Sequence, residues 1–299
     1  MPIIAVVGAT AAGKSDLALD LAEHLGGEVV NTDAMQVYRG MDIGTAKLPL
    51  AERRGITHHL LDLLDVTETA SVAEFQRMAR DVIADCRARG VLPVLVGGSA
   101  LYTRAIVDDF DFPGTDPALR ASLEEELTRV GSEALHARLA ERAPGAAAKI
   151  LPGNGRRVVR ALEVVELTGS FTAELPELRY HYDGVVQIGV GIDRPALDRR
   201  IEERVDRMWA GGLVDEVRGL VGRGLREGRT AGRALGYRQV LDLLDGDISE
   251  DEARRRTVAG TRRFARKQES WFGNDHRVSW VPYDDPDRLE RALSFVRDD

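Results

Sequence analysis

The residues best suited to chemistry lie near the N-terminus, where the spacing of glycine, lysine and hydroxyl side chains matches a P-loop. The stretch consists of Gly8, Ala9, Thr10, Ala11, Ala12, Gly13, Lys14 and Ser15. The two glycines let the backbone turn tightly and aim several N–H groups at one anion. Lys14 adds a mobile positive charge, and Ser15 adds a hydroxyl suited to Mg²⁺. An apolar run at 3–7 precedes the stretch and a helical pattern at 17–25 follows it. We therefore expect a strand, a phosphate-binding loop and a helix whose positive end faces the same anion.

A second candidate for chemistry follows the next apolar run. Residues 28–33 predict a strand with a polar tip at Asp33, and parallel-sheet enzymes place their chemistry at such carboxyl ends. The segment 33–47 mixes polar, glycine and aromatic residues without a steady period. We interpret it as a structured functional loop beside the P-loop.

The remaining apparatus of a P-loop NTPase is not evident in the sequence. The buried strand expected at 91–96 ends in two glycines and Ser99 rather than in the Mg²⁺-binding aspartate of such enzymes. Asp62 or Asp65 could fill that role. His58 and His59 lack a cysteine or third histidine at ligand spacing, which disfavours a metal site.

The order of the predicted strands and helices indicates an α/β protein with a P-loop-type parallel sheet flanked by helices, a small helical insertion domain and a helical C-terminal region. The predicted division is 1–114 for the first part of the core, 115–153 for the insertion and 154–299 for the rest of the core with a basic helical region. Cys86 is the single cysteine, which excludes a disulfide framework and favours a reducing, cytoplasmic setting. No apolar run approaches the length of a membrane span, and no signal peptide is expected.

The net charge of −8 disfavours an undiscriminating nucleic-acid coat but leaves room for a local basic face. A helix beginning near Arg156 has a basic first turn, which opposes the helix dipole and predicts a negative group nearby. A longer helix, 249–272, carries seven lysines or arginines and no acid between Arg254 and Lys267. Since it ends in Trp271 and Phe272, it is a candidate nucleic-acid face, with an ordinary solvated helix as the alternative.

With these motifs in place, the chain resembles the tRNA dimethylallyltransferases, also called tRNA isopentenyltransferases. The resemblance covers nearly the full length and rests on motifs at 8–15, 31–38, 40–47, 96–99, 160–164, 200–204, 236–239 and 261–271. It implies transfer of a dimethylallyl group from dimethylallyl diphosphate to N6 of the adenosine 3′ of the anticodon, position 37, in tRNAs that read codons starting with U. It also implies that the P-loop holds the prenyl diphosphate, which explains the missing aspartate. Ala34 and Ser99 depart from the serine and threonine usual there, and Gly273 replaces a basic residue of some relatives.

The chemistry of this reaction suggests roles for individual residues. An exocyclic adenine amine is a poor nucleophile and needs a base, for which both its position and the resemblance indicate Asp33. Lys14, Arg204 and Mg²⁺ held through Ser15 would stabilise the departing diphosphate. Ser99 would contact the adenine, which must leave the anticodon-loop stack to reach the site.

The resemblance further implies a set of tRNA contacts that would make binding dependent on salt. They are Asp33, Ala34, Met35, Gln36, Ser99, Arg120, Arg156, Arg157, Val158, Val159, Arg160, Arg233, Arg238, Arg266, Lys267, Gln268 and Trp271. The expected partners are dimethylallyl diphosphate and a tRNA anticodon stem-loop, with the protein acting as a monomer.

Three alternative functions remain open on sequence grounds. An ATP-dependent P-loop kinase would explain the first half of the chain but not the basic C-terminal helix. An isopentenyltransferase acting on free adenine nucleotides would not need the arginine clusters near Arg156 and Arg262. A non-enzymatic RNA-binding module would leave the P-loop unexplained.

Overall fold

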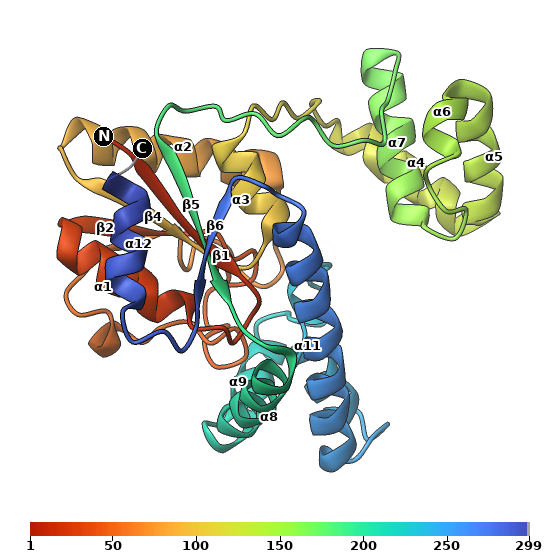
Figure 1. Ribbon diagram of the computed structural model, residues 1–299. Coiled ribbons are helices and arrows are strands. Elements are labelled where there is room, and N and C mark those ends of the chain that lie inside the picture. The colour runs from red at the N-terminus through yellow and green to blue at the C-terminus, as the bar shows by residue number, and fades with distance from the viewer. Residues whose placement is uncertain (298–299) are drawn as a thin grey trace. The chain divides into compact units, whose positions relative to one another are not determined.

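Six parallel strands form one sheet in the order β3-β2-β4-β1-β5-β6 (Figure 1). The computed structural model describes residues 1–297. The strands are β1 (Ile3–Gly8), β2 (Gly27–Asn31), β3 (His58–His59), β4 (Leu92–Val96), β5 (Val185–Gly191) and β6 (Val278–Pro282). Every residue of β1 is buried, as expected for a central strand of a parallel sheet covered on both faces.

The two faces of the sheet bury different helices. Ile4 and Val6 of β1 share an apolar cluster with α1 (Lys14–Leu25) and α12 (Arg288–Arg297). The alternate residues Ile3 and Ala5 pack with α2 (Val72–Ala88) and α3 (Ala100–Val107). The predicted α/β class, with a parallel sheet flanked by helices, is confirmed.

A helical layer follows β5 in the same unit. It contains α8 (Arg194–Ala210), α9 (Leu213–Val221), α10 (Tyr237–Leu244) and α11 (Glu250–Gly273). Short 3₁₀ turns lie at η1 (Leu50–Glu52) and η2 (Ala231–Arg233). In Figure 1, α11 runs alongside α8, the helix that carries Arg204. The basic helix and the candidate phosphate-stabilising arginine therefore lie on neighbouring elements.

The chain divides into two compact units, residues 1–108 with 180–299, and residues 109–179. The second unit contains α4 (Pro117–Val130), α5 (Ser132–Arg142), α6 (Pro144–Ala147) and α7 (Gly155–Thr168). It is wider than the predicted insertion 115–153, because it also contains α7, which lies within the range 154–299 predicted for the rest of the core. The physical reason is that Leu123 and Leu135 need the apolar face of α7 to complete their core. Within residues 1–297, no helix is both long enough and apolar enough to cross a membrane.

Candidate active site

Three loops meet at the carboxyl edge of the sheet, after β1, β2 and β4. Asn31 at the end of β2 lies opposite Val96 at the end of β4, which brings the following residues together. The backbone N–H of Ala34 donates to Ser99 Oγ at 3.2 Å. A Cβ on Gly97 would lie 2.2 Å from Thr32 Oγ1, so only glycine permits this close approach. The fold thus places the predicted Asp33 and Ser99 side by side.

Asn31 holds the backbone around Asp33 in place. Its Oδ1 accepts from the N–H of Asp33 at 2.8 Å, and its Nδ2 donates to the carbonyls of Asp33 at 3.1 Å and Leu60 at 3.0 Å. Asp33 Oδ1 in turn accepts from the N–H of Met35 at 2.8 Å. Asn31 is itself 3% exposed, so a buried side chain holds the backbone of the candidate base Asp33 in place.

A basic cavity of about 760 Å³ opens beside the Gly8–Ser15 loop. Its lining includes Lys14, Ser15, Lys47, Arg200, Arg204 and Arg207. Removal of water from the Lys14 ammonium, together with the charge of Arg204, lowers its pKa to about 8, although Asp33 partly opposes the shift. Burial also lowers the pKa of Arg204 from its ordinary value. Lys47 is already paired with Asp42 and Asp62. The lowered pKa values of Lys14 and Arg204 show that these two neighbouring cations are poorly solvated, an arrangement that favours an anionic ligand.

A second, largely apolar cavity of about 330 Å³ adjoins the basic one. Arg204 and Met208 line both cavities. The second cavity also receives Asp33, Ser99 and, from α11, Phe264. The candidate base, the phosphate-binding loop and the basic helix therefore lie around two adjoining cavities that share Arg204 and Met208.

The loop 42–47, which lines part of both cavities, is held by Glu216, which the sequence patterns did not single out, and by Tyr237 of the motif 236–239. Glu216 of α9 accepts from three consecutive backbone N–H groups, those of Asp42 at 3.0 Å, Ile43 at 2.7 Å and Gly44 at 3.2 Å. The hydroxyl of Tyr237 donates to the same carboxylate at 2.6 Å. Burial, and then the charge of Glu216, raises the pKa of Tyr237. No sequence period could have revealed this contact, because its partners are far apart along the chain.

The two alternatives for a Mg²⁺-binding aspartate lie elsewhere. Lys47 Nζ donates to Asp62 Oδ1 at 2.6 Å. Asp65 pairs with Arg39 and Arg223, each at 3.3 Å. Neither aspartate lines the basic cavity with Ser15, so the structure does not support either in that role.

The predicted RNA contacts on α11 fall on different faces of the helix. Arg266, Lys267 and Trp271 are exposed. Gln268 is 4% exposed and makes both of its side-chain hydrogen bonds inside the protein, which argues against its predicted role as a tRNA contact. Elsewhere in this unit, Arg233 and Arg238 line a separate cavity of about 300 Å³.

In the second unit, the predicted contacts are divided between surface and core. Arg156 and Arg157 are exposed, whereas the side chains of Val158 and Val159 are buried in the unit's apolar core. Those two side chains therefore cannot reach a ligand at the surface, contrary to the prediction. They face inward because α7 needs apolar residues where it packs on α4 and α5.

The negative group predicted near the basic turn is Glu163, which is fully buried. It accepts from Arg120 Nε at 2.8 Å, Arg160 at 2.7 Å and the Thr115 hydroxyl at 2.6 Å. Burial by itself would raise the pKa of Glu163, but these hydrogen bonds lower it to about 2. Arg120 and Arg160 are thus already paired with a protein carboxylate.

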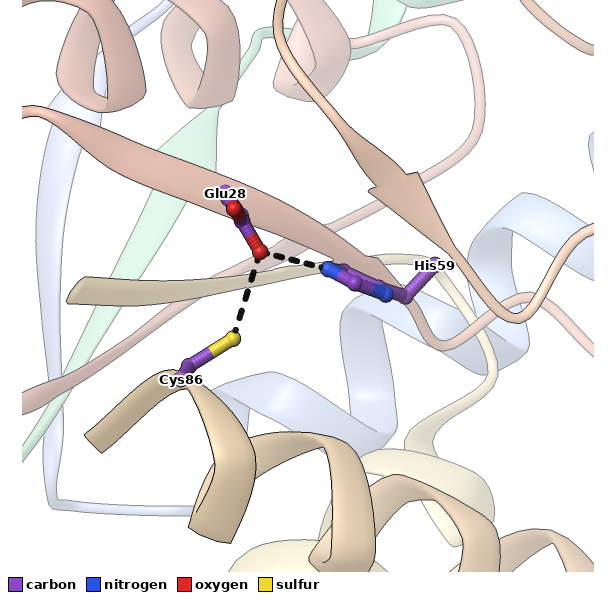
Figure 2. A group of neighbouring side chains, drawn as sticks. All are labelled: Glu28, His59 and Cys86. Atoms are coloured by element: carbon purple, nitrogen blue, oxygen red, sulfur yellow. Dashed lines mark hydrogen bonds and ion pairs between the residues drawn. The ribbon is translucent and has the colours of Figure 1, made fainter. Parts of the chain in front are cut away.

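Figure 2 shows the one group in residues 1–297 with the composition of a possible metal site, Glu28, His59 and Cys86. His59 Nε2 and Cys86 Sγ lie 2.7 and 3.5 Å from one oxygen of Glu28. Arg89 donates to both oxygens of the same carboxylate, at 2.9 and 2.7 Å. Burial and the nearby Glu28 raise the pKa of Cys86 to about 11. The positive charge of Arg89 and the protonated thiol of Cys86 both disfavour binding of a metal cation. Glu28, His59, Cys86 and Arg89 therefore form a structural cluster held by an ion pair and hydrogen bonds.

Taken together, the fold and the site define an α/β protein that places an anion-binding loop next to a carboxylate and an apolar chamber. The chain belongs to the IPP transferase family, whose sequence profile matches residues 36–275.

Similar proteins agree with this membership. A tRNA dimethylallyltransferase of Nocardioides sp. is 64% identical over 296 residues, covering 99% of this chain and 96% of the relative. One from Frankia casuarinae is 63% identical and covers 98% of this chain and all of the relative, 100%.

Solved structures show the same similarity. The full-length tRNA isopentenylpyrophosphate transferase from Bacillus halodurans is 40% identical with a TM-score of 0.73, covering 99% of this chain and 94% of that protein. A eukaryotic dimethylallyltransferase acting on tRNA is 25% identical with a TM-score of 0.81, covering 98% and 76%.

Proposed function

We propose that the protein transfers a dimethylallyl group from dimethylallyl diphosphate to N6 of adenosine 37, just 3′ of the anticodon, in tRNAs that read codons starting with U. The observation that carries the proposal is the junction of the two cavities. Lys14 and Arg204 face the basic side, Asp33 faces the apolar side, and Arg204 lines both. The names of the relatives support the same reaction.

The basic cavity suits the diphosphate of the donor. Negative charge grows on the leaving oxygen as the allylic carbon–oxygen bond breaks, and Lys14 and Arg204, which line this cavity, would stabilise that charge. Ser15 is exposed on this cavity, and its hydroxyl, with diphosphate oxygens and water, fits the oxygen ligands that Mg²⁺ prefers. When bound, Mg²⁺ would add charge neutralisation at the diphosphate.

The apolar cavity suits the prenyl chain and an extruded purine. Its volume of about 330 Å³ falls within the range of small-molecule sites. Asp33 would take the proton that N6 loses as the new carbon–nitrogen bond forms, and Ser99 would orient the base. The apolar walls exclude water from the partly cationic allylic fragment.

The outer face of α11 supplies a surface for RNA next to this cavity. Arg254, Arg255, Arg256 and Arg262 pair with carboxylates. Arg263, Arg266 and Lys267 form no ion pair with any of the residues in 1–297 and are exposed. Phe264 and Trp271 are each 41% exposed on the same helix. Unpaired cations beside exposed aromatic rings suit the phosphates and unstacked bases of an anticodon loop.

A labelled-donor assay tests the proposal. Labelled dimethylallyl diphosphate is incubated with the protein and either tRNA or AMP, and Asp33→Asn is compared with Asp65→Asn, an exposed carboxylate outside the cavities. We expect label in tRNA only, lost in Asp33→Asn and retained in Asp65→Asn, with donor binding intact in both. Label in AMP alone would favour the free-nucleotide enzyme, and ATP turnover without prenyl transfer would favour a kinase.

The proposal extends to a monomeric enzyme of the cytoplasm. One chain supplies both cavities and the basic helix, so no second copy is needed to complete the site. A single elution volume matching the 32.8 kDa chain, unchanged by dilution, is the expected result in size-exclusion chromatography.

A further inference from the structure

Gln268 connects three segments that meet at the floor of the site. From α11, its Oε1 accepts from the backbone N–H of Thr10 at 2.8 Å. Its Nε2 donates to the carbonyl of Gly98 at 2.8 Å. One buried amide thus joins the RNA-facing helix to the Gly8–Ser15 loop and to the loop that carries Ser99.

The surroundings of Gln268 leave little freedom for this connection. A Cβ on Gly98 would lie 2.2 Å from Gln268 Nε2 and 3.5 Å from the carbonyl of Gly8. Ala265 and Phe272 are buried on the same side of α11 as Gln268, whereas Arg266 and Lys267 are exposed. The inner face of the helix therefore fixes the loops, and its outer face remains available to RNA.

The two hydrogen bonds end at the backbone N–H of Thr10 and the carbonyl of Gly98. These two backbone atoms lie next to the residues proposed to react or bind substrate, but they take no part in the reaction. Thr10 and Ser99 both line the apolar cavity, and the Gly8–Ser15 loop borders the basic one. The Thr10 amide donates to Gln268 and the Ala12 amide donates to the carbonyl of Ala9 at 3.3 Å, so both loop N–H groups already have an acceptor within the protein. A small displacement of this loop would change the distance between donor and nucleophile, to which rates are sensitive.

We propose that Gln268 is a positioning residue that holds the diphosphate-binding loop and the Ser99 loop in register with the RNA-binding helix α11. It acts through Thr10 and Gly98 and touches neither substrate. The inference rests on the proposed prenyl transfer to tRNA and adds a residue that aligns the two substrates.

The first test replaces Gln268 with methionine, which keeps the length and bulk of the side chain but removes both hydrogen bonds. For Gln268→Met we expect the KM for dimethylallyl diphosphate to rise and kcat to fall, each by about tenfold or more, with tRNA affinity measured without donor changed by less than about twofold. The matched control is Lys267→Met, the exposed neighbour, which should weaken tRNA binding and leave the donor KM unchanged. Weaker tRNA binding without a donor effect in Gln268→Met would make Gln268 a direct tRNA contact and overturn the proposal, as would no change in either substrate.

A second measurement needs no variant and covers the case in which Gln268→Met does not fold. In the unliganded full-length protein, the Thr10 amide should exchange its hydrogen at least about tenfold more slowly than an unbonded loop amide. Rapid exchange at Thr10 would refute the hydrogen bond on which the role depends. Calorimetric binding of diphosphate by the wild type and by Gln268→Met separates this question from the reaction. A wild type that binds diphosphate but transfers no prenyl group would refute the proposed function while still testing the positioning role.

Discussion

The lowered pKa of Lys14 predicts an alkaline loss of activity at an unusually low pH for a lysine. Burial and the neighbouring Arg204 bring this pKa to about 8. The ammonium is then about nine-tenths protonated at pH 7 and about one-tenth protonated at pH 9. Since only the charged form stabilises the diphosphate, kcat/KM for dimethylallyl diphosphate should be level below pH 7 and fall about tenfold per pH unit above pH 8.

The lowered pKa of Lys14 also predicts how stability depends on pH: the free energy of unfolding should rise over the alkaline range in which activity falls. The unfolded chain keeps its lysine protonated up to about 10.5, whereas the folded protein releases the proton near pH 8. The unfolded state therefore binds more protons between these values, and the free energy of unfolding rises with pH across that window. Below pH 8 the charged lysine costs the fold about 1–3 kcal/mol. Lys14→Met should be more stable than the wild type by that amount at pH 7, with the difference vanishing towards pH 10.5.

Steady-state kinetics at saturating tRNA from about pH 6.5 to 9.5, together with urea unfolding at the two ends of that range, measure both effects. Lys14→Arg is the matched control because arginine stays charged throughout. This variant should show a lower but level kcat/KM over the alkaline range. An alkaline decline that persists in Lys14→Arg, or a Lys14→Met protein less stable than the wild type at pH 7, would refute the reasoning.

Three further substitutions test the supports around the site and in the second unit. Glu216→Ala leaves three N–H groups and a phenol without their acceptor and should lower the free energy of unfolding by about 2–4 kcal/mol in urea titrations; an unchanged midpoint would show that the carboxylate is dispensable. Gly44→Ala places a Cβ 2.4 Å from the ring of Tyr237 and should lower both stability and kcat, whereas Gly219→Ala, with nothing within 4 Å, serves as the tolerated control. Glu163→Leu leaves its two arginines unpaired and should destabilise the second unit by about 3–5 kcal/mol in hydrogen exchange. In the wild type the stabilisation by ionised Glu163 should be complete above pH 4.5 and should be lost only as the pH falls towards 2. If the wild type and Glu163→Leu unfold at the same acid pH, this reasoning is wrong.

Local patterns were enough to predict much of the first unit. The Gly8–Ser15 loop, the polar end of β2 and the capped helix α2 each depend on residues that are neighbours in the chain, and each lies where expected. The edge strand β6 was not predicted. Only Val278 and Val281 of its five residues, Val278–Pro282, are buried, so the segment lacks the alternation of a strand and is too short to distinguish from a loop.

The site was predicted less completely than the strands. Asp33 and Ser99 follow strands that a parallel sheet must align, so their proximity could be expected from the order of elements. Gln268 could not be assigned correctly, because sequence placed it in a basic helix without showing which face turns inward. Glu216 gave no signal, since a glutamate in the first turn of a helix is ordinary until its partner loop is known.

The sequence alone determined the chemistry that the chain can offer: an anion-binding loop, a carboxylate at a strand end and a surplus of cations on one helix. These features follow from residue type and from spacing over a few residues, and both are properties of the sequence that do not depend on how the distant parts of the chain pack. Only the tertiary structure decided which of those cations are already paired, which side chains are buried and which distant carboxylates and amides hold the loops in place. Such contacts join residues more than 150 positions apart, and no local periodicity records a contact that packing creates.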